Sequence, residues 1–204
     1  MKTNKLAIFF VCCLAAVSLT FMSCSDDDNN DSSLSKTDYQ TAFNAVRGDY
    51  TGKVYYPVPN DKTGKYDTDS ANVSWSIQKD SAMTIRNFPV AALGANVTDK
   101  DAREAIMKVA PQNISCRIIF SHVSPTFFAI YPSSVELNAN YGDKDHKLKI
   151  AFYVSPYISY GQQNAKSGPL YMQIVEGGVY EDGVLHSSWV TQGIPFQFVS
   201  SSKL

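Results

Sequence analysis

The sequence has no excess of basic residues. Its 204 residues include 18 lysines and arginines against 19 aspartates and glutamates, for a net charge of −1. After residue 33 the two counts are 16 and 15, and no stretch concentrates positive charge. Nucleic-acid-binding surfaces depend on such a concentration. We therefore expect no nucleic-acid partner.

Cysteines are too few and too scattered for a disulfide framework. Two of the four, Cys12 and Cys13, lie in an apolar N-terminal run, and Cys24 follows that run. Cys116 stands alone in the remainder, where it alternates with Ile118 and Phe120. That alternation is typical of a small buried strand residue. We expect a domain stabilised by its core, without disulfides.

Motifs for catalysis are also missing. There is no Gly-x-Ser-x-Gly elbow, and His122, His146 and His186 lie on different predicted strands or at their ends. Glycoside hydrolysis would need two acids facing each other across a cleft. The candidates are Glu136 and Glu176, and no sequence pattern links them. We predict no catalytic residue.

Metal-binding patterns are incomplete. The acidic pairs at positions 67 and 69 and at 143 and 145 lack the further ligands and the Glu of a calcium loop. Histidine and cysteine spacings do not fit zinc. We interpret these carboxylates as solvated loop charges and predict neither a metal site nor a cofactor.

The one long apolar run lies at the N-terminus and is short. It covers residues 6–20 and follows two lysines, Lys2 and Lys5. A membrane-spanning helix needs about 20 apolar residues. A shorter run behind basic residues is typical of a secretory signal. We predict a signal peptide over residues 1–23.

The residues after this run are Phe21-Met22-Ser23-Cys24, followed by Ser25-Asp26-Asp27-Asp28. The first group resembles the lipobox of bacterial lipoproteins, and the acidic group resembles the surface-export signal of Bacteroidetes-type lipoproteins. This resemblance implies lipidation of Cys24, membrane attachment through the lipid anchor, and an outer-membrane protein exposed on the cell surface. The alternative is a simple cleaved signal that leaves Cys24 as a reactive free thiol.

The rest of the chain predicts a mainly β domain. Residues 24–33 are acidic and polar and are expected to form a tether, which leaves residues 34–204 as a single β-rich domain. Two short helices are indicated, one capped by Ser35 and one capped by Thr98. Segments 60–70 and 160–168 are polar and are predicted as loops. Strands are expected over residues 49–56, 72–78, 83–88, 116–123, 127–131, 135–139, 147–154, 170–180, 184–190 and 194–199. Asp182-Gly183 is predicted to form the hairpin turn between the segments 170–180 and 184–190.

Side-chain alternation gives the orientation of several strands. Val73, Trp75 and Ile77 are predicted to face the core. Leu148, Ile150, Phe152 and Val154 form a second inward set, which leaves Tyr153 on the opposite face.

The strand number fits an antiparallel barrel or a two-sheet sandwich. The run Gly48-Asp49-Tyr50-Thr51-Gly52-Lys53-Val54 behind a short helix resembles the entry to calycin-type barrels. The chain is also similar to Bacteroidetes lipoprotein domains of about this length, including the domain of unknown function numbered 4840. Both architectures remain open at this point.

Aromatic side chains are the one surplus, with 12 tyrosines and 11 phenylalanines. In a sandwich, Tyr153 and Tyr171 would lie on an outer face, where exposed rings stack on sugars. In a barrel, a ligand would instead enter among Phe152, Met172 and Phe196. We predict a non-enzymatic module that binds a glycan or a small apolar ligand. The alternatives are a structural or interaction protein of the envelope and, less favoured, a hydrolase.

Overall fold

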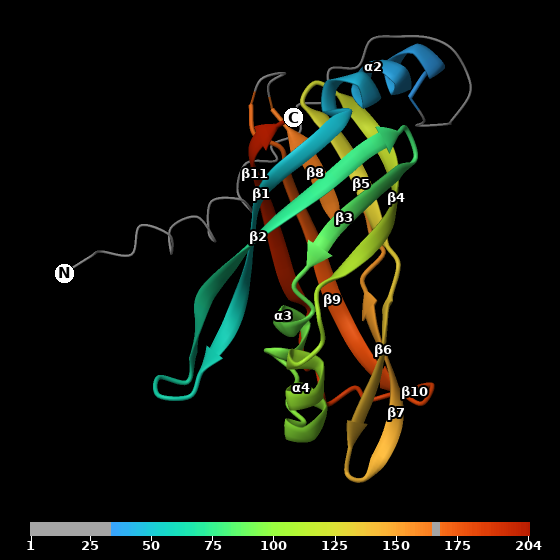
Figure 1. Ribbon diagram of the computed structural model, residues 1–204. Helices are drawn as coiled ribbons and strands as arrows, with labels where there is room; N and C mark the ends of the chain where they lie inside the picture. The colour runs from blue at the N-terminus through green and yellow to red at the C-terminus, as the bar shows by residue number, and fades with distance from the viewer. Residues whose placement is uncertain (1–33, 165–167) are drawn as a thin grey trace, which may run out of the picture. The chain divides into compact units, whose positions relative to one another are not determined.

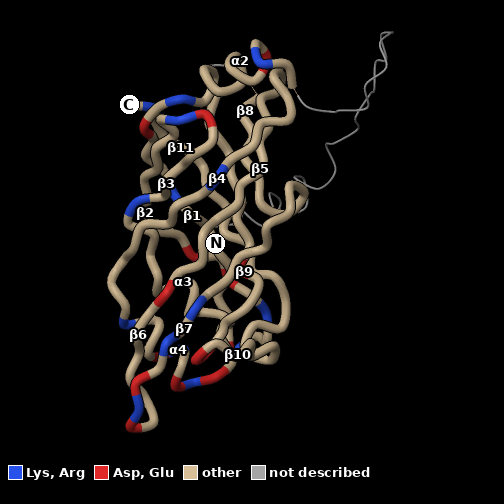
Figure 2. The backbone as a smooth tube through the Cα atoms, turned by 90° about the vertical axis from the view of Figure 1, so that its right-hand side faces the viewer, with Lys and Arg blue, Asp and Glu red and all other residues tan. Residues whose placement is uncertain are grey.

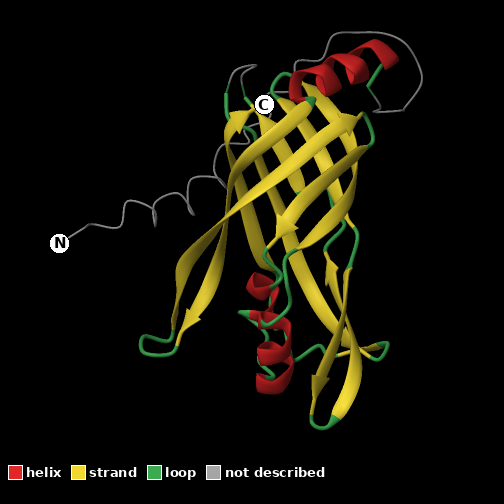
Figure 3. Ribbon diagram, viewed as in Figure 1, coloured by secondary structure: helices red, strands yellow, loops and turns green. Residues whose placement is uncertain are grey.

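The computed structural model describes residues 34–164 and 168–204. The predicted signal peptide, Cys24 and the acidic tether lie outside the described residues. Eight antiparallel strands form a closed barrel (Figures 1 and 3). They are β1 (Gly48–Asn60), β2 (Lys65–Lys79), β3 (Ala82–Phe88), β4 (Gln112–Val123), β5 (Thr126–Pro132), β8 (Tyr160–Gln163), β9 (Tyr171–Glu181) and β11 (Ile194–Lys203).

The barrel is closed by β11, which pairs with β9 on one side and with β1 on the other. Its strands follow one another around the wall in chain order. This closure confirms the barrel and rules out the sandwich, because no free edge separates two sheets within the wall. Such an up-and-down order needs only short connections between neighbouring strands.

Three strands lie outside the closed wall. β6 (Val135–Tyr141) and β7 (Lys144–Phe152) form a hairpin inserted between β5 and β8, and β7 pairs with the C-terminal half of β9. The two-residue β10 (Val184–Leu185) also pairs with β9 across the predicted Asp182-Gly183 turn. The hairpin therefore extends beyond the barrel at the end where α3 and α4 lie (Figure 1).

The described residues contain three helices: α2 (Lys36–Val46), α3 (Ala91–Gly94) and α4 (Lys100–Met107). The Ser35 cap is confirmed, since its Oγ accepts a hydrogen bond from the Asp38 N–H at 3.1 Å. The Thr98 cap is wrong by one residue, because Asp99 accepts from the Ala102 N–H at 2.9 Å. Thr98 instead donates to the Ser188 carbonyl. None of these helices is long and apolar enough to cross a membrane.

The barrel interior is filled by aromatic and branched side chains. Trp75 is fully buried and stacks on Tyr50 with ring centroids 5.7 Å apart. Phe88 contacts both Phe196 and Phe198, at 5.4 and 6.3 Å. The predicted inward set of Val73, Trp75 and Ile77 is confirmed by its burial. Eight-stranded barrels have interiors of about the volume that side chains fill.

Two predicted loops are strands. β1 and β2 continue as a two-stranded ribbon from Pro57↔Thr68 to Asn60↔Lys65, where a polar loop was expected. Pro57 and Pro59 are tolerated there because pairing with β11 ends at Tyr55, which makes this part of β1 an edge. The second missed strand is β8, predicted as a loop over 160–168.

One predicted core residue lies at the surface. Val154 is 59% exposed, although Leu148, Ile150 and Phe152 are buried as predicted. The reason is that β7 ends at Phe152. The alternation that assigned Val154 to the core does not continue beyond the last paired residue.

Candidate functional site

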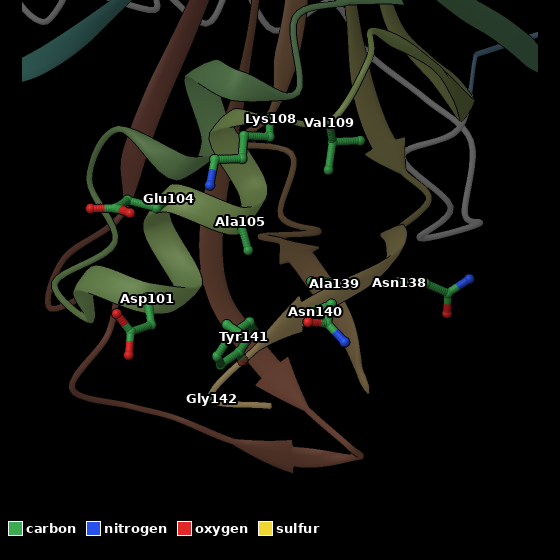
Figure 4. A pocket seen from close by; sticks show the side chains of 10 residues that line it. All are labelled: Asp101, Glu104, Ala105, Lys108, Val109, Asn138, Ala139, Asn140, Tyr141 and Gly142. Carbon is green, nitrogen blue, oxygen red and sulfur yellow. The ribbon is translucent and has the colours of Figure 1, made fainter. Parts of the chain in front are cut away.

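An open cleft of about 400 Å³ lies between α4 and β6 (Figure 4). That volume lies within the range of about 300–1,000 Å³ that is usual for small-molecule sites. The α4 wall continues into the two residues that follow the helix, and the β6 wall continues into the turn. The lining residues are Asp101, Glu104, Ala105, Lys108, Val109, Asn138, Ala139, Asn140, Tyr141 and Gly142.

The helical wall is one face of α4. Residues 101, 104, 105 and 108 are three or four apart and therefore share one side of the helix. Ala102 and Ile106, which are fully buried, anchor the other side to the core. This amphipathic pattern presents two carboxylates, Asp101 and Glu104, and one ammonium group, Lys108, along the cleft.

The strand wall is the edge of β6. Among the described residues, β6 pairs with β7 alone, so its other edge has no neighbouring strand. Consecutive residues 138–142 line the cleft, which places backbone amide and carbonyl groups in its wall. Asn138 and Asn140 are on the exposed face of the strand, opposite the buried Ala139. Asn140 Nδ2 donates to Asp145 Oδ1 at 2.7 Å.

Tyr141 forms one end of the cleft (Figure 4). One face of its ring stacks on His146, with centroids 4.2 Å apart and planes at 17°. Its hydroxyl donates to Glu181 Oε1 at 2.5 Å. Burial, followed by this carboxylate, raises the pKa of Tyr141 well above its ordinary value of 10.0. The phenol is therefore a fixed donor to Glu181, and only the ring face opposite His146 is available to a ligand.

Glu181 also contacts two histidines from distant parts of the chain. His146 Nδ1 lies 3.0 Å from Glu181 Oε1, and His186 Nε2 lies 3.2 Å from Oε2. His146 Nδ1 is 3.2 Å from Asp182 Oδ2 as well. A hydrogen bond from the Lys147 N–H, followed by the bond to His146, holds the pKa of Asp182 below its usual range. Within residues 34–164 and 168–204, no group of three or more His, Cys, Asp or Glu side chains is arranged to hold a metal ion.

The predicted ligand-binding tyrosines lie elsewhere, on the outer wall of the barrel. Tyr153 is 43% exposed and Tyr171 is 39% exposed. The Tyr153 ring packs over Gly177 and Gly193, where a Cβ would come within 3.3 and 3.2 Å of it. Its N–H donates to the carbonyl of Val175, four residues along β9 from Tyr171. That spacing is about 13 Å along a strand, so the two rings do not form one continuous stacking surface.

The alternative entry through the barrel leads into a packed interior. Phe152, Met172 and Phe196 all point inward and are at most 8% exposed. Phe196 lies against Tyr56, with centroids 5.8 Å apart, in addition to Phe88. A small apolar ligand would have to displace these rings.

The other side chains considered from the sequence do not join the cleft. Cys116 is 4% exposed, and burial raises its pKa to about 12, so the thiol is protonated at neutral pH. Glu136 is exposed on β6, whereas Glu176 is fully buried inside the barrel. The two carboxylates therefore do not face each other across a cleft.

The sequence did not reveal the Glu181 cluster. Its members come from β6, β7, the end of β9 and the segment after β10, and 40 residues separate Tyr141 from Glu181. The only local signal was the Asp182-Gly183 turn, which places Glu181 at the end of a strand. Neither histidine could be assigned to that carboxylate before the hairpin of β6 and β7 was located.

Comparison with known proteins identifies a family. A family model described as "Domain of unknown function (DUF4840)" matches residues 45–181. No curated protein and no solved structure matches the chain.

Proposed function

The chain belongs to the DUF4840 family of domains of unknown function, and we propose that it is a surface lipoprotein that binds a glycan between α4 and β6. The observation that carries this proposal is the mixed lining of the cleft. Two acidic residues, a lysine, two asparagines and a partly buried tyrosine line one open volume. Sugar hydroxyls both donate and accept hydrogen bonds, so they match such a lining.

The charge around the cleft supports a neutral or weakly charged ligand. Asp101, Glu104 and Lys108 lie along the same wall, so both signs of charge occur in the lining. Acidic and basic residues are interspersed around α4, β6, β7 and β10 (Figure 2). A strongly charged ligand would favour a surface of a single sign. A small apolar ligand is disfavoured because the lining is polar and the barrel interior is filled.

The proposed location rests on the residues around Cys24. We propose that the mature chain begins at lipidated Cys24 and is held in the outer membrane by its acyl chains. One acyl chain gives marginal binding, whereas two or more give stable attachment. In this arrangement the domain acts as a non-enzymatic binding module at the cell surface.

Replacing Cys24 with alanine is expected to abolish lipidation. Membrane fractionation and mass spectrometry of the mature N-terminus would measure the effect. We expect Cys24→Ala protein to be soluble or to retain its signal peptide. A Cys116→Ala variant, which keeps the anchor, serves as the control and should remain in the membrane. Outer-membrane fractionation of the Cys24→Ala variant at the wild-type level would rule out the lipoprotein proposal.

Glycan binding is tested with a soluble form that comprises residues 25–204. Binding would be found on a glycan array and quantified by calorimetry. Glu104→Ala and Asn140→Ala, one from each wall, are each expected to weaken binding about tenfold, as the loss of one well-formed hydrogen bond predicts. Tyr153→Ala and Tyr171→Ala should bind as wild type.

The opposite pattern would move the site to the outer barrel wall. In that case the two tyrosine variants lose affinity and the two cleft variants do not. A domain that binds no glycan on the array would leave the structural or interaction role ahead.

A further inference from the structure

The strand wall of the cleft is held by the carboxylate of Glu181, the last residue of β9. Glu181 Oε1 accepts a hydrogen bond from the Tyr141 hydroxyl at 2.5 Å. The same oxygen lies 3.0 Å from His146 Nδ1, which also contacts Asp182 Oδ2 at 3.2 Å. Tyr141 ends β6, and His146 belongs to the paired strand β7. Both strands of the hairpin are thus tied to the same oxygen.

The helical wall is linked to the other oxygen of the same carboxylate. Thr98, two residues before α4, donates its N–H to the Trp189 carbonyl at 2.9 Å and its hydroxyl to the Ser188 carbonyl at 2.8 Å. The Trp189 ring stacks on His186 with centroids 4.2 Å apart. His186 Nε2 in turn lies 3.2 Å from Glu181 Oε2.

We propose that Glu181 is the positioning residue of the cleft, which sets the separation of α4 from β6. Its side chain is only 19% exposed, and each of its two oxygens serves a different wall. This role matters for ligand binding only if the cleft binds a glycan, so the proposal rests on the proposed function. The spacing of the walls is nevertheless a property of the free protein.

The chemistry of the carboxylate explains why glutamate suits this position. An ionised carboxylate accepts hydrogen bonds at both oxygens, and every group that faces Glu181 is a donor or a ring nitrogen that can donate. Glutamine has the same shape but replaces one acceptor with an NH₂ donor. In a Glu181→Gln variant, that NH₂ group faces either the Tyr141 hydroxyl and His146 Nδ1 or His186 Nε2, so the variant loses an acceptor on one wall.

Hydrogen exchange of the ligand-free, lipidated full chain in detergent would test the role of Glu181. We expect amide exchange in α4 or in β6 to become about tenfold faster in Glu181→Gln. The loss of a hydrogen bond to a charged group changes the opening equilibrium by about tenfold or more. Exchange in β1–β3 should not change. Tyr141→Phe should affect β6 and β7 but not α4, and His186→Ala should affect α4 but not β6.

The matched control is Glu136→Gln, an exposed substitution on the same hairpin outside the cluster. It should leave both walls unchanged. The inference is overturned by a Glu181→Gln variant in which neither wall changes, or in which β1–β3 accelerate equally. If exchange changes as expected but the protein binds no glycan, the proposed function is wrong and the role of Glu181 in spacing the walls still holds.

Discussion

Replacing Trp75 with alanine is expected to lower the free energy of unfolding by about 3–5 kcal/mol. Trp75 is 0% exposed and lies directly opposite Tyr50 on the neighbouring strand. Its ring stacks on Tyr50 and meets Phe198 edge-on, with centroids 6.0 Å apart. The Trp75 ring packs against the backbone at Gly52, where a Cβ would come within 2.9 Å of Trp75 Cη2. Removing the ring would therefore leave a cavity bounded by several strands.

Urea denaturation followed by circular dichroism would measure this loss. A domain of this size is stabilised by about 5–15 kcal/mol in total, so the change should be large. Tyr157→Ala is the control, because Tyr157 is 88% exposed and should change stability by less than about 0.5 kcal/mol. A Trp75→Ala variant as stable as the control would contradict the placement of Trp75 in the barrel core.

Glu176 is expected to make the protein less stable as the pH rises from about 5 to 8. Its side chain alternates with Met172 and Ile174 on the inner face of β9, and it is 0% exposed. The residues opposite it, Phe152 and Ile194, are buried too. Neither carboxylate oxygen has a hydrogen-bond partner among the described residues. Burial raises the pKa of Glu176 from 4.5 to about 8.

The direction of the effect follows from the protons bound in each state. Between pH 4.5 and 8 the unfolded chain has lost the Glu176 proton, whereas the folded protein retains it. The free energy of unfolding therefore falls with rising pH in that window, at up to about 1.4 kcal/mol per pH unit. Over the whole window the loss is on the order of 3–5 kcal/mol.

Glu176→Gln removes this dependence, because the amide does not ionise. Chemical denaturation at a series of pH values would show the variant and the wild type close together near pH 5. By pH 8.5 the variant should be more stable. Glu136→Gln, an exposed substitution, should follow the wild type throughout. A constant difference between Glu176→Gln and wild type from pH 5 to 9 would show that the carboxyl is already ionised and solvated.

The elements that the sequence predicted well have strong local signals. The alternation of Val73, Trp75 and Ile77 identified the inner face of β2, and all three are buried. The Asp182-Gly183 turn has positive φ at both residues, 49° and 86°, as two-residue hairpin turns require. Barrel closure had no such signal, because pairing of β11 with both β9 and β1 joins segments that look alike in either architecture.

β8 was missed because its inner face carries no apolar side chain. Its two inward residues are Gly161 and Gln163. Gly161 is needed because the Phe128 ring occupies the position of a side chain, within 2.2 Å of where a Cβ would lie. Because the Phe128 ring of β5 fills the space on the inner face of β8, β8 needs no apolar side chain there and shows no hydrophobic alternation. The ribbon of β1 and β2 was missed for a related reason, since most of its residues beyond the barrel are not buried.

The candidate site was the least predictable part. The cleft combines a helix and a hairpin that are adjacent only in the folded chain, and Glu181 joins four segments. The exposure of Tyr153 and Tyr171 was foreseen from alternation and is confirmed by the fold. Their role in binding stays a prediction, which competes with the cleft.

The most direct test of the account is an ¹⁵N-resolved NMR titration of residues 25–204 with the oligosaccharide that binds best on the array. We expect the largest shift changes in α4 and at residues 138–142. Changes centred on Tyr153 and Tyr171, with α4 and β6 unaffected, would contradict a binding site between α4 and β6.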